Sequence, residues 1–263
     1  MSDLPKYQTI LLARRGRLLA ITLNRPEVLN AFGKIMHVEV IEALHFAASD
    51  PGSDVIMLTG AGRAFSAGGD LSRMEECIAD PSEFEREAAD AKRLVFALLD
   101  LEKPIIAKVN GPAVGLGATI ALLCDVIFAA DTARIGDPHV KVGLVAGDGG
   151  AVIWPHLIGF ARAKEYLMTG ALIPAPKAAE MGLINHAVPA AELDGRVDAF
   201  CDELVAGARL AIRWTKTTVN LELKRIAHAL MDPGIAYEAL TQRSEDHRKA
   251  VQAMREKIQQ REK

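Results

Sequence analysis

Two glycine-rich corners are the residues of this chain with the clearest potential for chemistry. Gly115-Leu116-Gly117 follows the apolar run Ile105–Val109, which has the composition of a buried strand, and it precedes an apolar stretch typical of a helix. Gly68-Gly69 lies in a similar bend after a strand predicted over Asp54–Thr59. Two such bends can direct two backbone N–H groups at one carbonyl oxygen, which is the arrangement of an oxyanion hole.

A loop rich in glycine, proline and ionisable residues, between residues 137 and 150, could supply proton transfer. His139 suits acid–base work because its reference pKa of about 6.5 lies near operating pH. Asp148 could orient the imidazole, but it also precedes Gly149-Gly150 and a helical stretch, where aspartate is a frequent N-cap. Both roles remain open, and Asp137 is expected to be a structural hydrogen-bonding residue.

Composition excludes several classes of function. The 263 residues carry a net charge of −3 without a basic stripe, which argues against a nucleic-acid surface. No apolar run reaches the ~20 residues that span a bilayer, and the N-terminus lacks the pattern of a signal peptide. The three cysteines show no metal-binding spacing, so we expect reduced thiols, no metal site and a cytoplasmic protein without membrane contact.

The order of apolar patterns indicates a mixed α/β body followed by helices. A hairpin, a helix over Lys34–Ser49 and further buried strands fill the first half, whereas the polar stretch Ser72–Pro81 is expected to be a loop or lid. Ser82 with Glu85 resembles a capping box that opens a helix to about Asp100. The later helices are predicted around Trp154 and over Arg162–Met168, Pro176–Met181, Ala190–Ala208, Ala211–Leu230 and Ile235–Gln260.

Three sequence blocks resemble the signatures of the crotonase (enoyl-CoA hydratase/isomerase) superfamily. They are Leu23–Ala31, Gly62–Leu71 and Lys103–Asp125, and the likeness continues through 159–170 and 179–185. The resemblance implies an α/β fold, a crotonase-like spiral of β-β-α units over 1–200. It also implies a C-terminal helical trimerisation region over 201–263, and therefore a homotrimer or a dimer of trimers.

The resemblance implies that the substrate is an acyl-CoA thioester whose enolate is held by the N–H groups of Gly69 and Leu116. No separate cofactor is expected, because coenzyme A arrives as part of the substrate. Adenine is expected near Ser66 and Ala67, and Lys257 either meets a phosphate from a neighbouring subunit or is an ordinary exposed lysine. The positions implied for coenzyme A are Val28, Ala31, Ser66, Ala67, Asp70 and Lys257.

The chain departs from the family at the two glutamates that serve hydratases as acid and base. By the same blocks those positions hold Thr119 and His139. A threonine hydroxyl can position a water but cannot act as a base near neutral pH. We therefore expect a hydratase or isomerase with a non-standard acid/base set built from His139, Thr119 and Asp148.

Two other functions remain open. The stretch Gly143–Gly149, followed by Trp154-Pro155-His156, resembles the β-diketone hydrolases such as 6-oxocamphor hydrolase, which cleave carbon–carbon bonds with a histidine and an aspartate. His139 and Asp148 would then hydrolyse a cyclic β-diketone. Alternatively, loss of both glutamates could leave a non-catalytic acyl-CoA binder.

Overall fold

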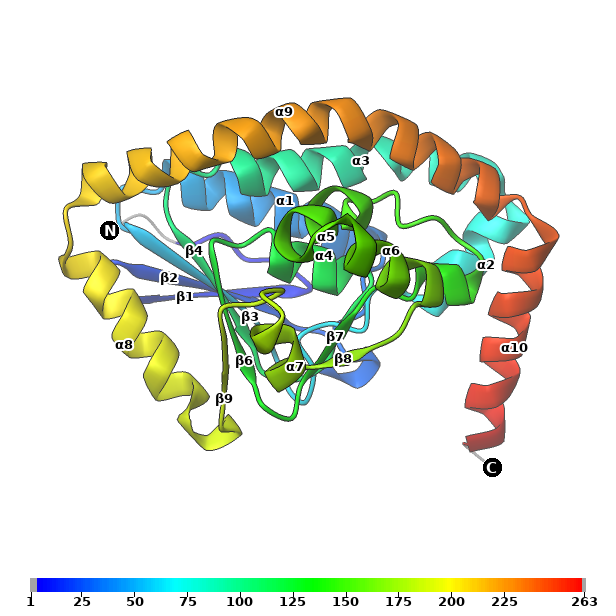
Figure 1. The fold of residues 1–263 in the computed structure, drawn as a ribbon, viewed down its shortest axis with the longest axis horizontal. Helices are drawn as coiled ribbons and strands as arrows, with labels where there is room; N and C mark the ends of the chain where they lie inside the picture. The colour runs from blue at the N-terminus through cyan, green and yellow to red at the C-terminus, as the bar shows by residue number, and fades with distance from the viewer. Residues whose placement is uncertain (1–3, 262–263) are drawn as a thin grey trace.

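A six-stranded sheet forms the centre of the molecule in the computed structural model, which describes residues 4–261 (Figure 1). Its spatial order is β1-β2-β3-β4-β6-β9, with only the β1–β2 pair antiparallel. Parallel neighbours need long crossover connections, so helices cover the sheet and its inner strands are apolar. The strands are β1 (Ile10–Arg15), β2 (Leu18–Leu23), β3 (Val55–Gly60), β4 (Ile105–Val109), β6 (Val126–Ala130) and β9 (His186–Val188).

A second, three-stranded sheet joins the chain segments that carry the candidate site. It pairs β7 (Arg134–Gly136) with both β5 (Ala113–Val114) and β8 (Ile173–Pro174). The glycine corner at residue 115 leads directly from β5 into α4 (Leu116–Leu122), and the loop of His139 follows β7. This small sheet therefore brings the second corner and the ionisable loop to one place.

The remaining helices surround these two sheets. The α-helices are α1 (Lys34–Ser49), α2 (Leu71–Ala79), α3 (Pro81–Asp100), α5 (Gly150–Ile158), α6 (Phe160–Thr169), α7 (Ala175–Glu180), α8 (Leu193–Ala206), α9 (Arg209–Gln242) and α10 (Glu245–Arg261). Short 3-10 turns are η1 (Pro26–Val28), η2 (His139–Val142) and η3 (Ala190–Glu192). None of the helices within residues 4–261 is long and apolar enough to cross a membrane.

The predicted hairpin, the helix α1 and the buried strands are confirmed, but the loop expected over Ser72–Pro81 is wrong. Most of that stretch is α2, whose first turn is capped by the Asp70 side chain accepting from the Ser72 N–H at 3.0 Å. The capping box at Ser82 is also wrong. Asp80 is the N-cap of α3, accepting from the Ser82 N–H at 3.0 Å, and Pro81 occupies the first helical turn.

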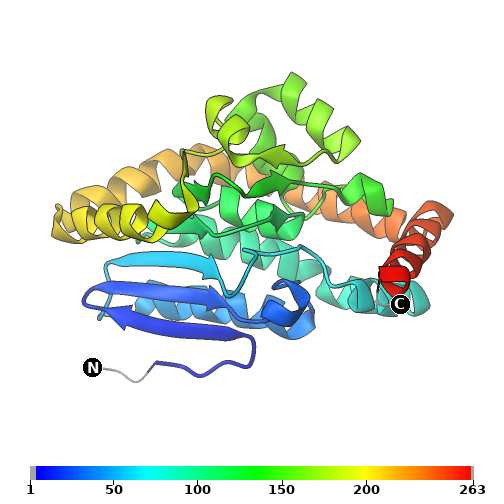
Figure 2. The same ribbon diagram turned by 90° about the horizontal axis from the view of Figure 1, so that it is seen from below.

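The C-terminal third contains fewer breaks than the sequence predicts. Helix α9 continues through Pro233, where two helices were expected, and it curves along α3 in Figure 1. Helix α10 then turns away and lies beside α2, where the Arg255 guanidinium contacts Glu75 at 2.7 Å (Figure 2). The division proposed between 1–200 and 201–263 falls inside α8, a helix that packs on β3, β4 and β6.

Candidate active site

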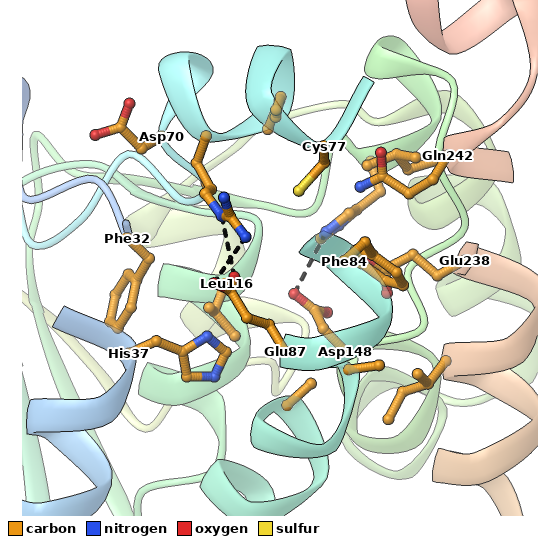
Figure 3. Close-up of a pocket in the computed structure, with 18 of the residues that line it drawn as sticks. Phe32, His37, Asp70, Cys77, Phe84, Glu87, Leu116, Asp148, Glu238 and Gln242 are labelled. Carbon is orange, nitrogen blue, oxygen red and sulfur yellow. Dashed lines mark hydrogen bonds and ion pairs between the residues drawn. The ribbon is translucent and has the colours of Figure 1, made fainter. Parts of the chain in front are cut away.

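A cavity of about 130 Å³ lies between the two glycine corners, the loop after β7 and helix α9 (Figure 3). Gly69 and Leu116 contribute one wall, and His139 and Asp148 contribute another. Helices α1, α2, α3 and α9 complete it with mostly apolar side chains. The structure therefore brings four of the five predicted catalytic residues to one cavity, and the fifth, Thr119, is not among the residues that line it.

The two corners pack directly against each other because glycine occupies their tightest positions. Gly68 has φ +88°, and a Cβ added there would lie 2.6 Å from the Val114 carbonyl oxygen. Phe32 holds the first corner from both sides: its N–H donates to the Gly68 carbonyl at 2.7 Å, and its carbonyl accepts from Asp70 at 3.0 Å. Within residues 4–261, neither the N–H of Gly69 nor that of Leu116 donates a hydrogen bond to another residue.

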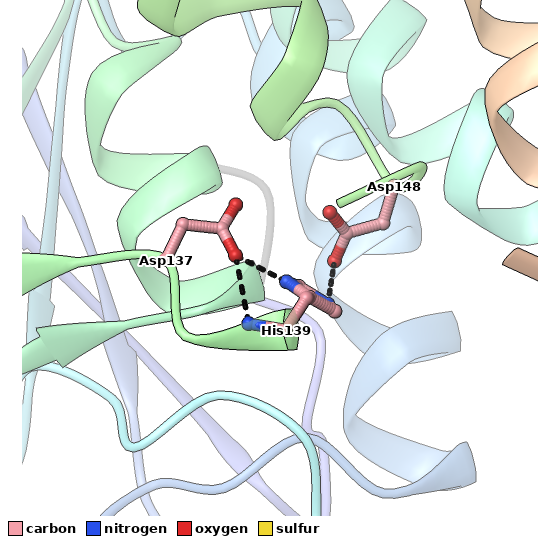
Figure 4. A group of neighbouring side chains, drawn as sticks. All are labelled: Asp137, His139 and Asp148. Atoms are coloured by element: carbon pink, nitrogen blue, oxygen red, sulfur yellow. Dashed lines mark hydrogen bonds and ion pairs between the residues drawn. The ribbon is translucent and has the colours of Figure 1, made fainter. Parts of the chain in front are cut away.

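His139 lies between two carboxylates (Figure 4). Its Nδ1 is hydrogen-bonded to Asp137 Oδ1, which also accepts from the His139 backbone N–H at 3.3 Å. Its Nε2 lies 3.4 Å from Asp148 Oδ2. Asp137, expected to be only a structural residue, is thus a direct partner of the imidazole and fixes the orientation of the ring. The Asp-Pro-His spacing was the only sequence signal for this contact.

Burial and the two carboxylates set the protonation of this trio. Burial alone would lower the pKa of His139, but the negative charges of Asp137 and Asp148 outweigh it and raise that pKa well above its usual range. Burial raises the pKa of Asp148, but the charge and hydrogen bond of His139 dominate and lower it. The two shifts favour an imidazolium at His139 and an ionised carboxylate at Asp148.

Asp148 is not the N-cap of α5. Gly149 occupies that position, and no side chain makes a capping hydrogen bond there. Asp148 is 7% exposed, and its Oδ1 is buried without a hydrogen-bond partner in the described structure. Its carboxylate faces the imidazole through Oδ2, and the Gly150 N–H also favours its ionised form.

Thr119 lies behind this arrangement. It is fully buried, its Oγ1 has no hydrogen-bond partner within residues 4–261, and a Cβ on Gly149 would come within 2.8 Å of its methyl group. The threonine thus packs under the turn that carries Asp148.

Two cavity residues on α9 escaped the sequence analysis. Glu238 and Gln242 are one helical turn apart and only 6% and 7% exposed. Burial, and then the charge of Asp148, raise the pKa of Glu238 to about 8, so it is mostly protonated at neutral pH. The i, i+4 spacing of Glu238 and Gln242 can be seen in the sequence, but polar residues at that spacing are usually on the exposed face of a helix.

The positions predicted for coenzyme A lie outside the cavity wall except Asp70. Ser66 is fully buried and braces the first corner: its hydroxyl donates to the Asn30 carbonyl at 2.8 Å and accepts from the Gly68 N–H at 3.1 Å. Asp70 accepts from the Arg25 guanidinium at 2.9 Å. Val28 and Lys257 are exposed, Ala31 is buried and Ala67 is half-buried.

The same trio could in principle hold a cation. One ligand atom from each of Asp137, His139 and Asp148 lies within 4.8 Å of the others. Both ring nitrogens already face carboxylates, however, so the imidazole has no free nitrogen to offer. The arrangement suits a shared proton better than a metal ion.

Comparisons with known proteins identify the family of the chain. Residues 14–262 match the protein family described as enoyl-CoA hydratase/isomerase. A probable enoyl-CoA hydratase of Mycobacterium bovis is 35% identical over 232 residues, covering 88% of this chain and 87% of that protein. A crotonyl-CoA hydratase of Syntrophomonas wolfei is 34% identical, covering 81% and 82% respectively.

The fold is shared with solved members of the same group. The crystal structure of an enoyl-CoA hydratase/isomerase from Mycobacterium paratuberculosis superposes with a TM-score of 0.90 at 36% identity, covering 95% of this chain and all of that one. The crotonase-type α/β fold with its C-terminal helices is therefore confirmed. The chain is an enzyme of the enoyl-CoA hydratase/isomerase family, a member of the crotonase superfamily.

Proposed function

We propose that the cavity binds the acyl group of a coenzyme A thioester and that the N–H groups of Gly69 and Leu116 form its oxyanion hole. The observation that carries this proposal is the pair of unengaged amides lining the same cavity as His139. A carbonyl oxygen that accepts from both gains charge when the thioester becomes an enolate. Donors already in place stabilise that charge without reorganising.

The acid–base step follows from the charges of the trio. In hydration, Asp148 takes a proton from water while the water oxygen bonds to C3 of a 2-enoyl thioester. The C2–C3 π electrons move toward the thioester oxygen, and the enolate then takes a proton at C2 from the His139 imidazolium. The proton on Asp148 returns to His139 across their 3.4 Å contact, which restores the starting state.

Coenzyme A enters only as part of the substrate in this proposal. Its pantetheine is assigned to the side of Val28 and Ala31, and Lys257 is a candidate for its phosphate in a homotrimer or a dimer of trimers. Thr119 supports the Asp148 turn and takes no proton.

The test is hydration of crotonyl-CoA by the purified enzyme and by His139→Ala. The substitution should lower kcat by about 10²–10⁴ and leave acetyl-CoA binding measurable by calorimetry. His156→Ala, at an exposed histidine of α5, is the matched control and should keep full activity. Absence of CoA thioester binding at millimolar concentration would refute the proposal, and binding without turnover would favour a non-catalytic binder.

A second candidate is hydrolysis of a cyclic β-diketone. The observation that favours it is the direct contact of His139 with Asp148, the pairing that the resemblance to 6-oxocamphor hydrolase implies. Incubation with a bicyclic β-diketone separates the two functions, because only this second one yields a ring-opened keto acid.

A further inference from the structure

The cavity has a polar end opposite the side where coenzyme A is proposed to leave. Figure 3 shows Phe32 and Asp70 at one side, Leu116 in the middle, and Glu238 and Gln242 at the other side. In the proposed function the thioester oxygen sits at Gly69 and Leu116, with pantetheine on the Phe32 side. The far end of the acyl group must then point toward α9.

Glu238 lines this end of the cavity, the Gly147 N–H faces its carboxyl group, and the protonated form of that group adds a hydrogen-bond donor. The imidazolium of His139 is already balanced by two aspartates, so a further negative charge beside them is unfavourable. A Cβ on Gly147 would lie 2.9 Å from Glu238 Oε2, which places this carboxyl group immediately beside the Asp148 turn. A protonated carboxyl group both donates and accepts a hydrogen bond.

Gln242 adds an amide whose hydrogen bonding is incomplete. Its Oε1 is buried, and no partner for it occurs among the residues that the structure describes. Buried polar atoms in native proteins nearly always have a partner, so an unpartnered amide oxygen on a residue of the cavity wall is suited to a ligand. Spacing of four residues puts Gln242 on the same face of α9 as Glu238.

Among the described residues that line the cavity, the two cations, Arg73 and His139, already have acidic partners. Cys77, Phe84 and Ile235 are apolar residues of the same cavity wall. Arg73 is held by Glu76, Glu83 and Glu87 at 2.7, 2.8 and 2.7 Å, and His139 faces Asp137 and Asp148. A carboxylate on the substrate would therefore find no counter-ion, whereas a neutral oxygen would find both a donor and an acceptor.

We propose that the natural acyl group is short and carries a neutral oxygen, a hydroxyl or a ketone, that Glu238 and Gln242 bind at its far end. The size of the cavity supports a short chain, since about 130 Å³ is close to the ~150 Å³ that holds a benzene-sized ligand of about six heavy atoms. The inference rests on the proposed function, because it takes the position of the thioester from the oxyanion hole.

Thioesters that differ only in this oxygen test the inference. The enzyme should hydrate 5-hydroxy-2-hexenoyl-CoA or 5-oxo-2-hexenoyl-CoA with a kcat/KM at least about 10-fold above that for 2-hexenoyl-CoA. Gln242→Leu should remove this preference mainly by slowing the oxygenated substrates. Glu238→Gln, which keeps a neutral donor and acceptor, should retain most of the preference, and Glu238→Leu should lose it. Gln252→Leu, on the exposed face of α10, is the control and should change nothing.

Each other outcome has a definite meaning. If Gln242→Leu slows all three thioesters equally, the residue holds the attacking water and the inference is wrong. If the unmodified enzyme hydrates 2-hexenoyl-CoA as well as the oxygenated thioesters, the inference fails while the proposed function stands. If it binds none of them, the proposed function fails as well.

Discussion

At the scale of single residues, the two glycines of the first corner differ in how much change they tolerate. A Cβ on Gly69 would meet only the end of the flexible Met74 side chain, at 2.8 Å, whereas one on Gly68 would meet backbone. Gly69→Pro, which deletes the proposed donor, should therefore lower kcat by about 10²–10³, while Gly69→Ala, which keeps it, should retain most activity. Steady-state hydration kinetics check this. Equal losses in both variants would count against a role for the N–H group.

The partners of His139 make a second prediction at this scale. Asp137→Asn removes a negative charge that favours the imidazolium, so the pKa of His139 should fall toward its ordinary value. If the imidazolium gives the proton to C2, the decline of kcat on the alkaline side should then move to lower pH. The pH profile of kcat, together with an NMR titration of the ring, measures both shifts. An unmoved profile would show that another group controls the step.

Sequence reasoning located several residues of the candidate site but not the contacts that join them. Motif blocks located Gly69, Leu116 and His139, because backbone corners and loop histidines leave local signals. Glu238 was missed because α9 reaches the cavity from about a hundred residues away, a tertiary contact that no local pattern encodes. The loop expected before α3 failed for a similar reason: Arg73 stabilises α2 by pairing with Glu83 and Glu87 of α3.

At the scale of elements, α10 supports the loop of His139. Buried His247 donates from Nδ1 to the Val142 carbonyl at 2.6 Å. Gly143, at φ +71°, lies so close that a Cβ there would be 2.7 Å from the His247 backbone nitrogen. The last residue of η2 is thus held by the first turn of α10.

His247→Ala should leave that buried carbonyl unpaired and lower the free energy of unfolding by about 1–3 kcal/mol. Because the same contact positions η2, kcat should fall more than KM changes. Thermal unfolding and hydration kinetics measure the two effects. A variant with lower stability but unchanged kcat would limit the role of α10 to stability.

At the scale of the whole molecule, α9 has an apolar outer side without a partner in the described chain. Trp214, Val219, Leu221 and Leu240 are each more than half exposed. Such an unpaired surface is typical of an oligomer interface. Light scattering should give about three or six times the 28.3 kDa chain mass, and Leu221→Glu should reduce it. A monomer at micromolar concentration would contradict this expectation.

The buried acids and imidazole have a consequence for the heat of unfolding. Glu238 holds a proton up to pH about 8 in the folded protein, against an ordinary value of 4.5, and His139 holds one well above 6.5. Because both groups bind a proton more tightly in the folded protein, their contribution to stability is fully present at pH values below their pKa values in the unfolded chain. That contribution is lost as the pH rises through their pKa values in the folded protein. Near pH 7.5, unfolding should release up to about two protons to the buffer from these groups. The calorimetric enthalpy should then differ between phosphate and Tris, and this difference should shrink in Glu238→Gln.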